Sequence, residues 1–239
     1  MIRPEVKDRL RSAKKVAVLT GAGVSAESGV PTFRGEKGLW KNFRAEELAT
    51  PQAFHRDPKL VWEWYDWRRG LIADIKPNPG HFALADLEKR YDDFTLITQN
   101  VDGLHELAGS KNMVELHGNV WKVRCTVEGT VSDNHEAPLG ELPPLCECGA
   151  MLRPHIVWFG ESLEPDVLRK AFDASRACEV FIVAGTSAVV QPAASLAGLA
   201  ADGGAFVIEV NPDKTPITDL VSAHLQGKSG EVLPLLLEE

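Results

Sequence analysis

Four short runs of apolar residues stand out along the chain, and each is followed at once by small or polar residues. The runs are nearly continuous, which is typical of parallel strands buried on both faces of a sheet. They occupy residues 15–20, 94–98, 180–184 and 205–210. Apolar residues at helical spacing separate them, most clearly at residues 58–72, 81–90 and 165–175. Strands that alternate with helices predict an α/β fold with a doubly wound parallel sheet.

Residues 121–153 interrupt this rhythm. They are rich in Gly, Pro and acidic residues, and they contain three of the four cysteines of the chain, Cys125, Cys146 and Cys148. Four cysteines are too few for a disulfide scaffold, whereas three in one segment indicate a metal site or its remnant. We therefore predict a small inserted module between two parts of a main domain, residues 1–120 and 154–239.

Composition excludes several classes of function. The 239 residues carry a formal net charge of -8, so no nucleic-acid partner is expected, because phosphate binding depends on clustered Lys and Arg. No apolar stretch is long enough to span a bilayer, and residues 1–15 lack the apolar core of a signal peptide. We expect a cytoplasmic monomer that has no membrane partner.

Candidate chemistry begins directly after the first predicted strand, where residues 21–26 read Gly-Ala-Gly-Val-Ser-Ala. Ligands bind open parallel sheets at this edge, and small residues let backbone amides approach a phosphate. The third glycine of the usual dinucleotide fingerprint is absent, and glycine is common in turns of this kind. The turn alone therefore favours a phosphate site and a purely structural turn about equally.

Three later segments make the interpretation specific. Residues 29–34 read Gly-Val-Pro-Thr-Phe-Arg, residues 98–105 read Thr-Gln-Asn-Val-Asp-Gly-Leu-His, and residues 116–118 read Leu-His-Gly. With the first turn, in this order and spacing, they resemble the sirtuin family of NAD-dependent protein deacylases. The resemblance implies a Rossmann-like NAD-binding domain with a small zinc-ribbon-like module. It also implies a transferase-type enzyme that consumes NAD and acts on acyl-lysine proteins or peptides, giving free lysine, nicotinamide and O-acyl-ADP-ribose.

The resemblance assigns catalytic roles to three residues. His117 matches the family's general base, and a neutral imidazole can accept a ribose hydroxyl proton near neutral pH. Asn100 and Asp102 match the pair beside the nicotinamide, where polar groups hold the carboxamide and an ordered water. Outside this motif, a single histidine such as His117 is more often a satisfied core residue.

The resemblance also assigns contacts to NAD. Gln99 is expected at the ribose hydroxyls, Phe33 as a cover against water, Arg34 near the phosphates or ribose, Asn211 at the adenine ribose and Ser229 at the adenine. The predicted NAD-binding residues are Gly21, Ala22, Gly23, Ser25, Thr32, Phe33, Arg34, Gln99, Gly185, Thr186, Ser187, Asn211 and Ser229. For the later turns a purely structural interpretation remains open, because Gly, Ser, Thr and Asn are common turn residues.

The acyl-lysine substrate has its own predicted residues. Val157, Trp158, Phe159 and Gly160 match the family's substrate segment, to which an extended peptide adds by main-chain hydrogen bonds. The choice of acyl group must therefore come from the pocket that receives the lysine side chain.

Tyr65 and Arg68 lie three apart on one face of a predicted helix. They match the Tyr-x-x-Arg signature of the class III branch, which prefers succinyl, malonyl and glutaryl lysine. The guanidinium would pair with the distal carboxylate and the phenol would add a hydrogen bond, while Ala49 would widen the pocket. We expect acetyl to be a weaker substrate. Without the sirtuin framework, an amphipathic helix with core aromatics and solvent-facing arginines is the simpler interpretation.

The metal site departs from the family pattern, in which two cysteine pairs hold a structural zinc. Glu128 stands where the second cysteine is expected, and the other pair is compressed to Cys146-Glu147-Cys148. A closed tetrahedral site needs a fourth ligand, which could be Glu128, Asp133, His135 or water. An empty relic is the alternative.

Two other functions remain open. Relatives also use NAD for ADP-ribosyl transfer or plain hydrolysis, and Tyr65, Arg68 and the substrate segment favour deacylation over both. A module that only senses NAD would be expected to lack the base, whereas His117 is present.

Overall fold

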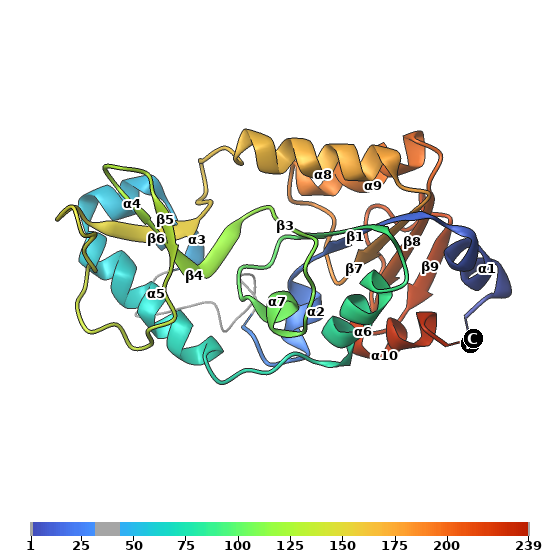
Figure 1. Cartoon of the computed structure of the whole chain (residues 1–239), viewed down its shortest axis with the longest axis horizontal. Coiled ribbons are helices and arrows are strands. Elements are labelled where there is room, and N and C mark those ends of the chain that lie inside the picture. Colours follow the sequence, from blue (N-terminus) through green and yellow to red (C-terminus); the bar gives the residue numbers. More distant parts are fainter. Residues whose placement is uncertain (1, 32–43, 239) are drawn as a thin grey trace.

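The computed structural model describes residues 2–31 and 44–238. Within these ranges a six-stranded parallel sheet, ordered β3-β2-β1-β7-β8-β9, forms the centre of the main domain, and a three-stranded antiparallel sheet, ordered β5-β4-β6, forms a small module beside it (Figure 1). The predicted doubly wound α/β fold is confirmed. None of the described helices is both long and apolar enough to cross a membrane.

The large sheet is built from six strands that pair in parallel register: β1 (Lys15–Thr20), β2 (Asp93–Thr98), β3 (Met113–Glu115), β7 (Val180–Ala184), β8 (Phe206–Asn211) and β9 (Ala223–Gln226). Four of them correspond to the apolar runs of the sequence. The chain extends the sheet in one direction from β1 to β3 and in the other from β7 to β9. The order therefore reverses between β1 and β7, the position at which open α/β sheets bind ligands.

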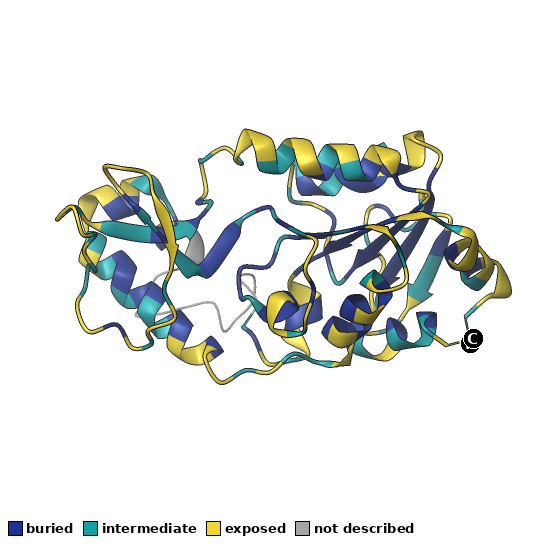
Figure 2. Cartoon of the chain, viewed as in Figure 1, coloured by how far each residue is buried: buried dark blue, intermediate teal, exposed yellow. Residues whose placement is uncertain are grey.

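Helices cover both faces of this sheet, whose strands are buried along most of their length (Figure 2). They are α1 (Pro4–Ser12), α2 (Ala22–Ala26), α6 (Pro79–Glu88), α7 (Leu104–Leu107), α8 (Pro165–Ala177), η2 (Ala193–Ser195), α9 (Leu196–Asp202), α10 (Ser229–Val232) and η3 (Pro234–Leu236). Alternate residues of each strand enter different cores. Val16 and Val18 pack with α1, α6 and α10, whereas Ala17 and Leu19 pack with α8 and α9.

The small module combines two parts of the chain. Its sheet consists of β4 (Gly118–Cys125), β5 (Val131–Asp133) and β6 (Leu152–Ile156), and three helices accompany it, α3 (Ala45–Leu48), α4 (Pro51–Arg56) and α5 (Pro58–Ile72). Trp62, Trp64 and Tyr65 of α5 share one core with Val123 of β4 and Ile156 of β6. The predicted module at residues 121–153 covers most of this sheet, and the pairing of β4 with β6 begins earlier, at Gly118.

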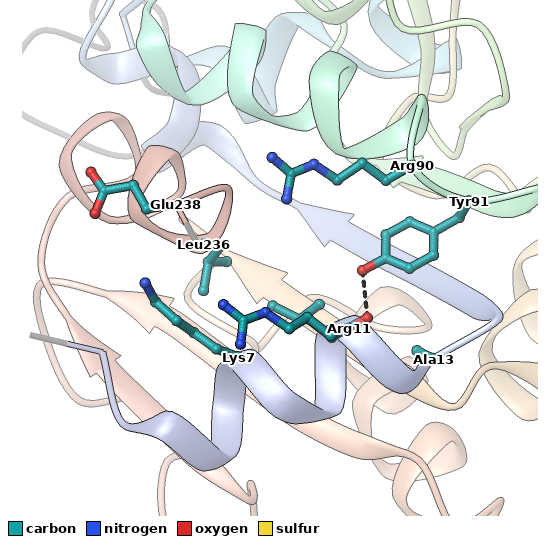
Figure 3. Close-up of a pocket in the computed structure, with 8 residues that line it drawn as sticks. Lys7, Arg11, Ala13, Arg90, Tyr91, Leu236 and Glu238 are labelled. Carbon is teal, nitrogen blue, oxygen red and sulfur yellow. Dashed lines mark hydrogen bonds between the residues drawn. The ribbon is translucent and has the colours of Figure 1, made fainter.

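Both ends of the described chain meet at the far end of the large sheet. Lys7 and Arg11 of α1, Arg90 and Tyr91 before β2, and Leu236 and Glu238 near the C-terminus line a pocket there (Figure 3). The Tyr91 hydroxyl donates to the Leu10 carbonyl (2.8 Å), and Arg90 donates to the Leu237 carbonyl (2.7 Å). This pocket contains none of the predicted site residues, and its hydrogen bonds join α1 and the C-terminal segment to the residues that precede β2.

A cluster of buried polar side chains lies beneath the carboxyl ends of β1 and β2. Thr20 Oγ1 donates to Thr98 Oγ1 (2.9 Å) and lies 3.0 Å from His105 Nε2. The rings of His81 and His105 lie 4.7 Å apart between centroids. Both side chains are buried, so water cannot solvate a charge on either ring.

Burial sets the charge of these two histidines. It lowers the pKa of His81 to about 4. Burial, together with the neighbouring His81, lowers the pKa of His105 to about 3. Both rings are therefore neutral in the folded protein near neutral pH.

Acid should destabilise the fold through these two side chains. In the unfolded chain, histidine titrates near its ordinary pKa of 6.5. As the pH falls below 6.5, His81 and His105 therefore become protonated in the unfolded chain but stay neutral in the folded chain. Stability is lost progressively toward about pH 4, by up to about 1.4 kcal/mol per pH unit for each histidine. Urea unfolding at several pH values should show that His105→Gln flattens this dependence. The exposed His55→Gln serves as the control and should leave it unchanged; equal slopes in all three proteins would contradict the assignment.

Candidate active site

The parallel register brings the ends of the central strands to one edge of the sheet. Thr20 at the end of β1 pairs with Thr98 of β2 and with Ala184 of β7, and Ala184 pairs with Val210 of β8. The turns after these strands therefore meet at the switch point of the sheet. Nearly all the predicted NAD-binding residues that the structure describes lie at these strand ends, in the turns that follow them or in α2 directly after β1.

The turns after β1 and β7 touch backbone to backbone. A Cβ on Gly21 would lie 2.7 Å from Thr186 Cβ, and one on Gly23 would lie 2.7 Å from the Gly185 carbonyl oxygen. Gly185 has a φ of +60°, and a Cβ there would lie 2.5 Å from the Val24 nitrogen. Any larger residue at these positions would separate the turns. The glycines thus keep the two turns in contact, and the amide of Gly23 donates to the Gly185 carbonyl (2.7 Å).

Polar side chains tie the remaining turns to this pair. Gln99 Nε2 donates to Thr186 Oγ1 (3.1 Å) and to the Thr20 carbonyl (3.3 Å). Asn211 Nδ2 donates to the Thr186 carbonyl (2.7 Å). The edge is therefore a connected set of groups in which the turns of β1, β2, β7 and β8 fix one another.

Asn100 and Asp102 follow β2 and lie against α2. Asn100 Nδ2 donates to the Gly21 carbonyl and to Ser25 Oγ, both at 3.0 Å. Burial raises the pKa of Asp102, while hydrogen bonds from the Leu104 N–H and from Ser25 and the charge of Arg68 act to lower it. Asp102 is thus a buried carboxyl whose hydrogen-bond partners come from α7 and α2, with a cation of α5 nearby.

His117 is positioned as an acceptor of protons. Its Nδ1 lies 3.0 Å from the Gln99 carbonyl oxygen, which can only accept, so Nδ1 carries the hydrogen and Nε2 keeps its lone pair. Burial lowers the pKa of His117, partly offset by this hydrogen bond. The imidazole is therefore neutral at neutral pH and can act as a base.

Segment 157–160 lies between His117 and the small module. The Val157 N–H donates to the His117 carbonyl, and the Phe159 N–H donates to the Ala49 carbonyl, both at 2.9 Å. Trp158 Nε1 donates to the Tyr65 hydroxyl (2.8 Å). Phe159 remains 48% exposed, so an apolar ring faces solvent beside the residues that the sequence assigns to the substrate.

Tyr65 and Arg68 are both buried on α5. Burial raises the pKa of Tyr65, so its phenol stays protonated and keeps a hydrogen to donate while its oxygen accepts from Trp158. Burial lowers the pKa of Arg68, while the neighbouring Tyr65 and Asp102 side chains act to raise it. The guanidinium also lies 5.5 Å from the Trp64 ring centroid. The simpler interpretation, in which this arginine faces water, is therefore wrong, because Arg68 is only 6% exposed.

The structure places the other predicted residues as follows. Ala22, Gly23 and Ser187 are exposed at the sheet edge, and Gly160 is exposed at the end of the substrate segment. Ser229 begins α10 after β9 and is only 2% exposed. Thr32, Phe33 and Arg34 lie outside the described residues, so their predicted roles stay predictions.

Sequence patterns do not single out His81 or Thr20. His81 Nδ1 accepts from the Asn78 N–H, so its Nε2 carries the hydrogen that points to Ser25 Oγ (3.3 Å). His81 occupies a helix position that could equally face water, and Thr20 ends an apolar run. Only the structure shows that His81 lies within hydrogen-bond distance of Ser25 and that Thr20 hydrogen-bonds to Thr98.

The three clustered cysteines lie in the small module with Glu128. Their sulfur atoms and a carboxylate oxygen of Glu128 all lie within 4.8 Å of one another. Four ligand atoms at this spacing fit a tetrahedral metal ion, and a structural zinc is compatible with this cluster. The site lies at the opposite end of β4 from His117.

The chain matches known proteins over most of its length. The model of the Sir2 family matches residues 21–192. An NAD-dependent protein deacylase of Aquifex aeolicus is 59% identical over 215 residues, 90% of both chains, and one of Pyrococcus furiosus is 50% identical over 241 residues, 98% of this chain and 96% of the relative.

Solved structures agree in fold. A Sir2 homolog–NAD complex has a TM-score of 0.93 at 49% identity, covering 99% of this chain and 93% of the other. A complex described as Sir2–p53 peptide–NAD+ has a TM-score of 0.88 at 33% identity, covering 100% and 98%. By its sequence, its fold and the arrangement of its sheet edge, the chain belongs to the Sir2 family of NAD-dependent protein deacylases.

Proposed function

We propose that this NAD-dependent protein deacylase removes acyl groups from lysine side chains and prefers groups that end in a carboxylate, such as succinyl, malonyl and glutaryl. The names of the relatives support deacylation and leave the acyl group open. The observation that carries the preference is that Tyr65 and Ala49 both hydrogen-bond to the segment beside His117, while the buried guanidinium of Arg68 interacts with Tyr65 and Asp102.

The sheet edge supports binding of NAD as the co-substrate. NAD, when bound, supplies an electrophilic ribose carbon, C1′, and nicotinamide as a leaving group. The glycines let the turns after β1 and β7 approach each other closely. Ala22, Gly23 and Ser187 are exposed at this edge, so a dinucleotide can approach the backbone there. Asn100 and Asp102, buried at the same edge, offer polar groups for the nicotinamide end.

His117 then acts as the base. Its Nε2 lone pair can accept the proton of a ribose hydroxyl, because Nδ1 is held by the Gln99 carbonyl (3.0 Å). Segment 157–160 hydrogen-bonds to His117 itself, so a peptide laid along this segment brings its acyl-lysine to the base. Exposed Phe159 offers an apolar surface for that peptide.

The acyl pocket follows from the same contacts. Tyr65 keeps a phenol hydrogen, and Arg68 provides a guanidinium in a nearly water-free environment, where a charge-assisted pair with a carboxylate is strong. Binding a plain acetyl group would leave that guanidinium without the substrate carboxylate, which favours longer acidic chains.

Acetyl preference is the second candidate. Two solved relatives are described as complexes with 2'-O-acetyl ADP ribose and with a deacetylated p53 peptide. These proteins are 49% and 33% identical to this chain, so acetyl-lysine is the necessary comparison substrate.

In the primary test, the purified protein receives NAD together with a succinyl-lysine peptide or a matched acetyl-lysine peptide. The formation of nicotinamide and of O-acyl-ADP-ribose is measured. Nicotinamide release should depend on peptide and should be faster with the succinyl peptide. His117→Tyr should lower turnover of both peptides by about two orders of magnitude or more, because the base is lost. Release of nicotinamide without peptide would indicate NAD hydrolysis instead, and full activity of the variant would remove His117 as the base.

Arg68→Met should separate the two acyl classes. Methionine keeps an apolar side chain of similar length but cannot pair with a carboxylate, so kcat/KM for the succinyl peptide should fall about a hundredfold or more. The acetyl reaction should change less than about tenfold. The exposed Arg56→Met is the matched control and should leave both reactions intact. Equal losses on both peptides would refute acidic-acyl selectivity.

The pH profile should follow the lowered pKa of His117. A base is inactive when protonated, so log kcat/KM should fall only as pH drops through that pKa, below the ordinary 6.5. Between about pH 7 and 8 the profile should be flat with respect to this group. An acidic limb centred above 6.5 would show that the base is not buried in this way.

A further inference from the structure

The small module gathers three thiols and one carboxylate at a single point. Cys125 ends β4, Glu128 lies in the turn that follows, and Cys146 and Cys148 lie in a second turn before β6. Cys125 is buried, Cys146 is partly buried, and Cys148 and Glu128 are exposed. One side of the cluster therefore rests on the module and the other faces solvent.

The distances within the cluster match those between ligands of one ion. Zn–S bonds of about 2.3 Å in a tetrahedron place two sulfurs about 3.8 Å apart, and a sulfur and an oxygen slightly closer. Cys125 Sγ and Cys148 Sγ lie 3.5 Å apart, and Cys146 Sγ and Glu128 Oε2 lie 3.8 Å apart. The four atoms thus already have nearly the spacing of a tetrahedral ligand set.

Backbone hydrogen bonds close the two turns that carry the cysteines and Glu128. After Cys125, the Gly129 N–H donates to the Cys125 carbonyl (3.1 Å), and the Glu128 N–H points to Cys125 Sγ (3.4 Å). After Cys146, the Gly149 N–H donates to the Cys146 carbonyl (2.8 Å). Gly129 and Gly149 have φ values of +71° and +83°. Each turn therefore closes on a glycine in the left-handed region.

A bridge between the two turns holds them together. The Thr126 N–H and Oγ1 both donate to the Met151 carbonyl, at 3.1 and 2.8 Å. These hydrogen bonds join the first turn to the residue that follows the second turn.

The other acidic and histidine candidates lie elsewhere. The ring of His135 stacks on Trp121, 5.7 Å between centroids. Asp133 pairs with Lys122 in the register of β5 on β4. Among the residues that the structure describes, the group that converges on the three cysteines contains Glu128 alone as a fourth side chain.

We propose that Glu128 replaces the missing cysteine as the fourth ligand of the structural zinc in this chain, so that its carboxylate completes the site formed by the thiolates of Cys125, Cys146 and Cys148. The proposal does not depend on the acyl preference. The carboxylate is a harder ligand than thiolate and lies on the solvent side, so this zinc exchanges with chelators more readily than one held by four cysteines.

The test measures metal rather than turnover. The full chain, purified under reducing conditions with zinc, should contain about one zinc per chain. Cobalt in place of zinc should give the visible bands of a tetrahedral ion and the charge-transfer absorption of three thiolates. Glu128→Cys should raise that absorption to about four-thirds and slow the loss of metal to a chelator, because a fourth thiolate replaces the carboxylate.

Glu128→Gln should weaken zinc binding about tenfold or more in competition with a chelator. The neighbouring Glu147→Gln is the matched control and should bind as the natural chain does. His117→Tyr should also bind zinc normally, which separates failure of the metal site from failure of the proposed catalysis. Absence of zinc from the reduced natural chain, or unchanged cobalt absorption in Glu128→Cys, would overturn the proposal.

Discussion

The contact between the turn after β1 and the turn after β7 is the constraint on which the rest of the site depends. Three glycines allow it, because a Cβ at any of them would approach neighbouring atoms to between 2.5 and 2.7 Å. Gln99 and Asn211 are hydrogen-bonded to Thr186 within this contact, so the turns of four strands form one surface. A separation of the two turns would therefore displace groups from every strand that contributes to the edge.

Burial then decides which groups of the site carry charge. His81, His105 and His117 all have lowered pKa values because water is excluded around them. Neutral imidazoles have one donating and one accepting nitrogen, and the Asn78 N–H and the Gln99 carbonyl fix which is which in His81 and His117. Burial also raises the pKa of Asp102, and the charge of Arg68 on α5 acts against that effect.

The pair of strands β4 and β6 links the small module to this chemistry. β4 begins at Gly118, next to His117, and ends at Cys125 in the metal-ligand cluster. β6 runs back from Leu152 to Ile156, next to Val157, whose N–H binds the His117 carbonyl. The two ends of one short antiparallel pair thus hold the proposed zinc and the proposed substrate segment. A structural ion at one end can stabilise the position of the segment at the other without any contact with the substrate.

The amino-acid sequence by itself determined four strands of the central sheet and the order of the polar turns. Long apolar runs identify strands buried on both faces, whereas β3 and β9 are short, half-buried edge strands whose pattern is too weak to predict. The sequence also placed Tyr65 and Arg68 on one helix face, because helical spacing is a local property. Tertiary structure alone decided that Arg68 is buried near Asp102, that His81 and His105 are neutral, and that Glu128 rather than Asp133 or His135 joins the cysteines. The spacing of residues along a helix or strand determines on which face of that element a side chain lies. Its burial, its charge state and its convergence with other ligands depend on which other elements pack against that face.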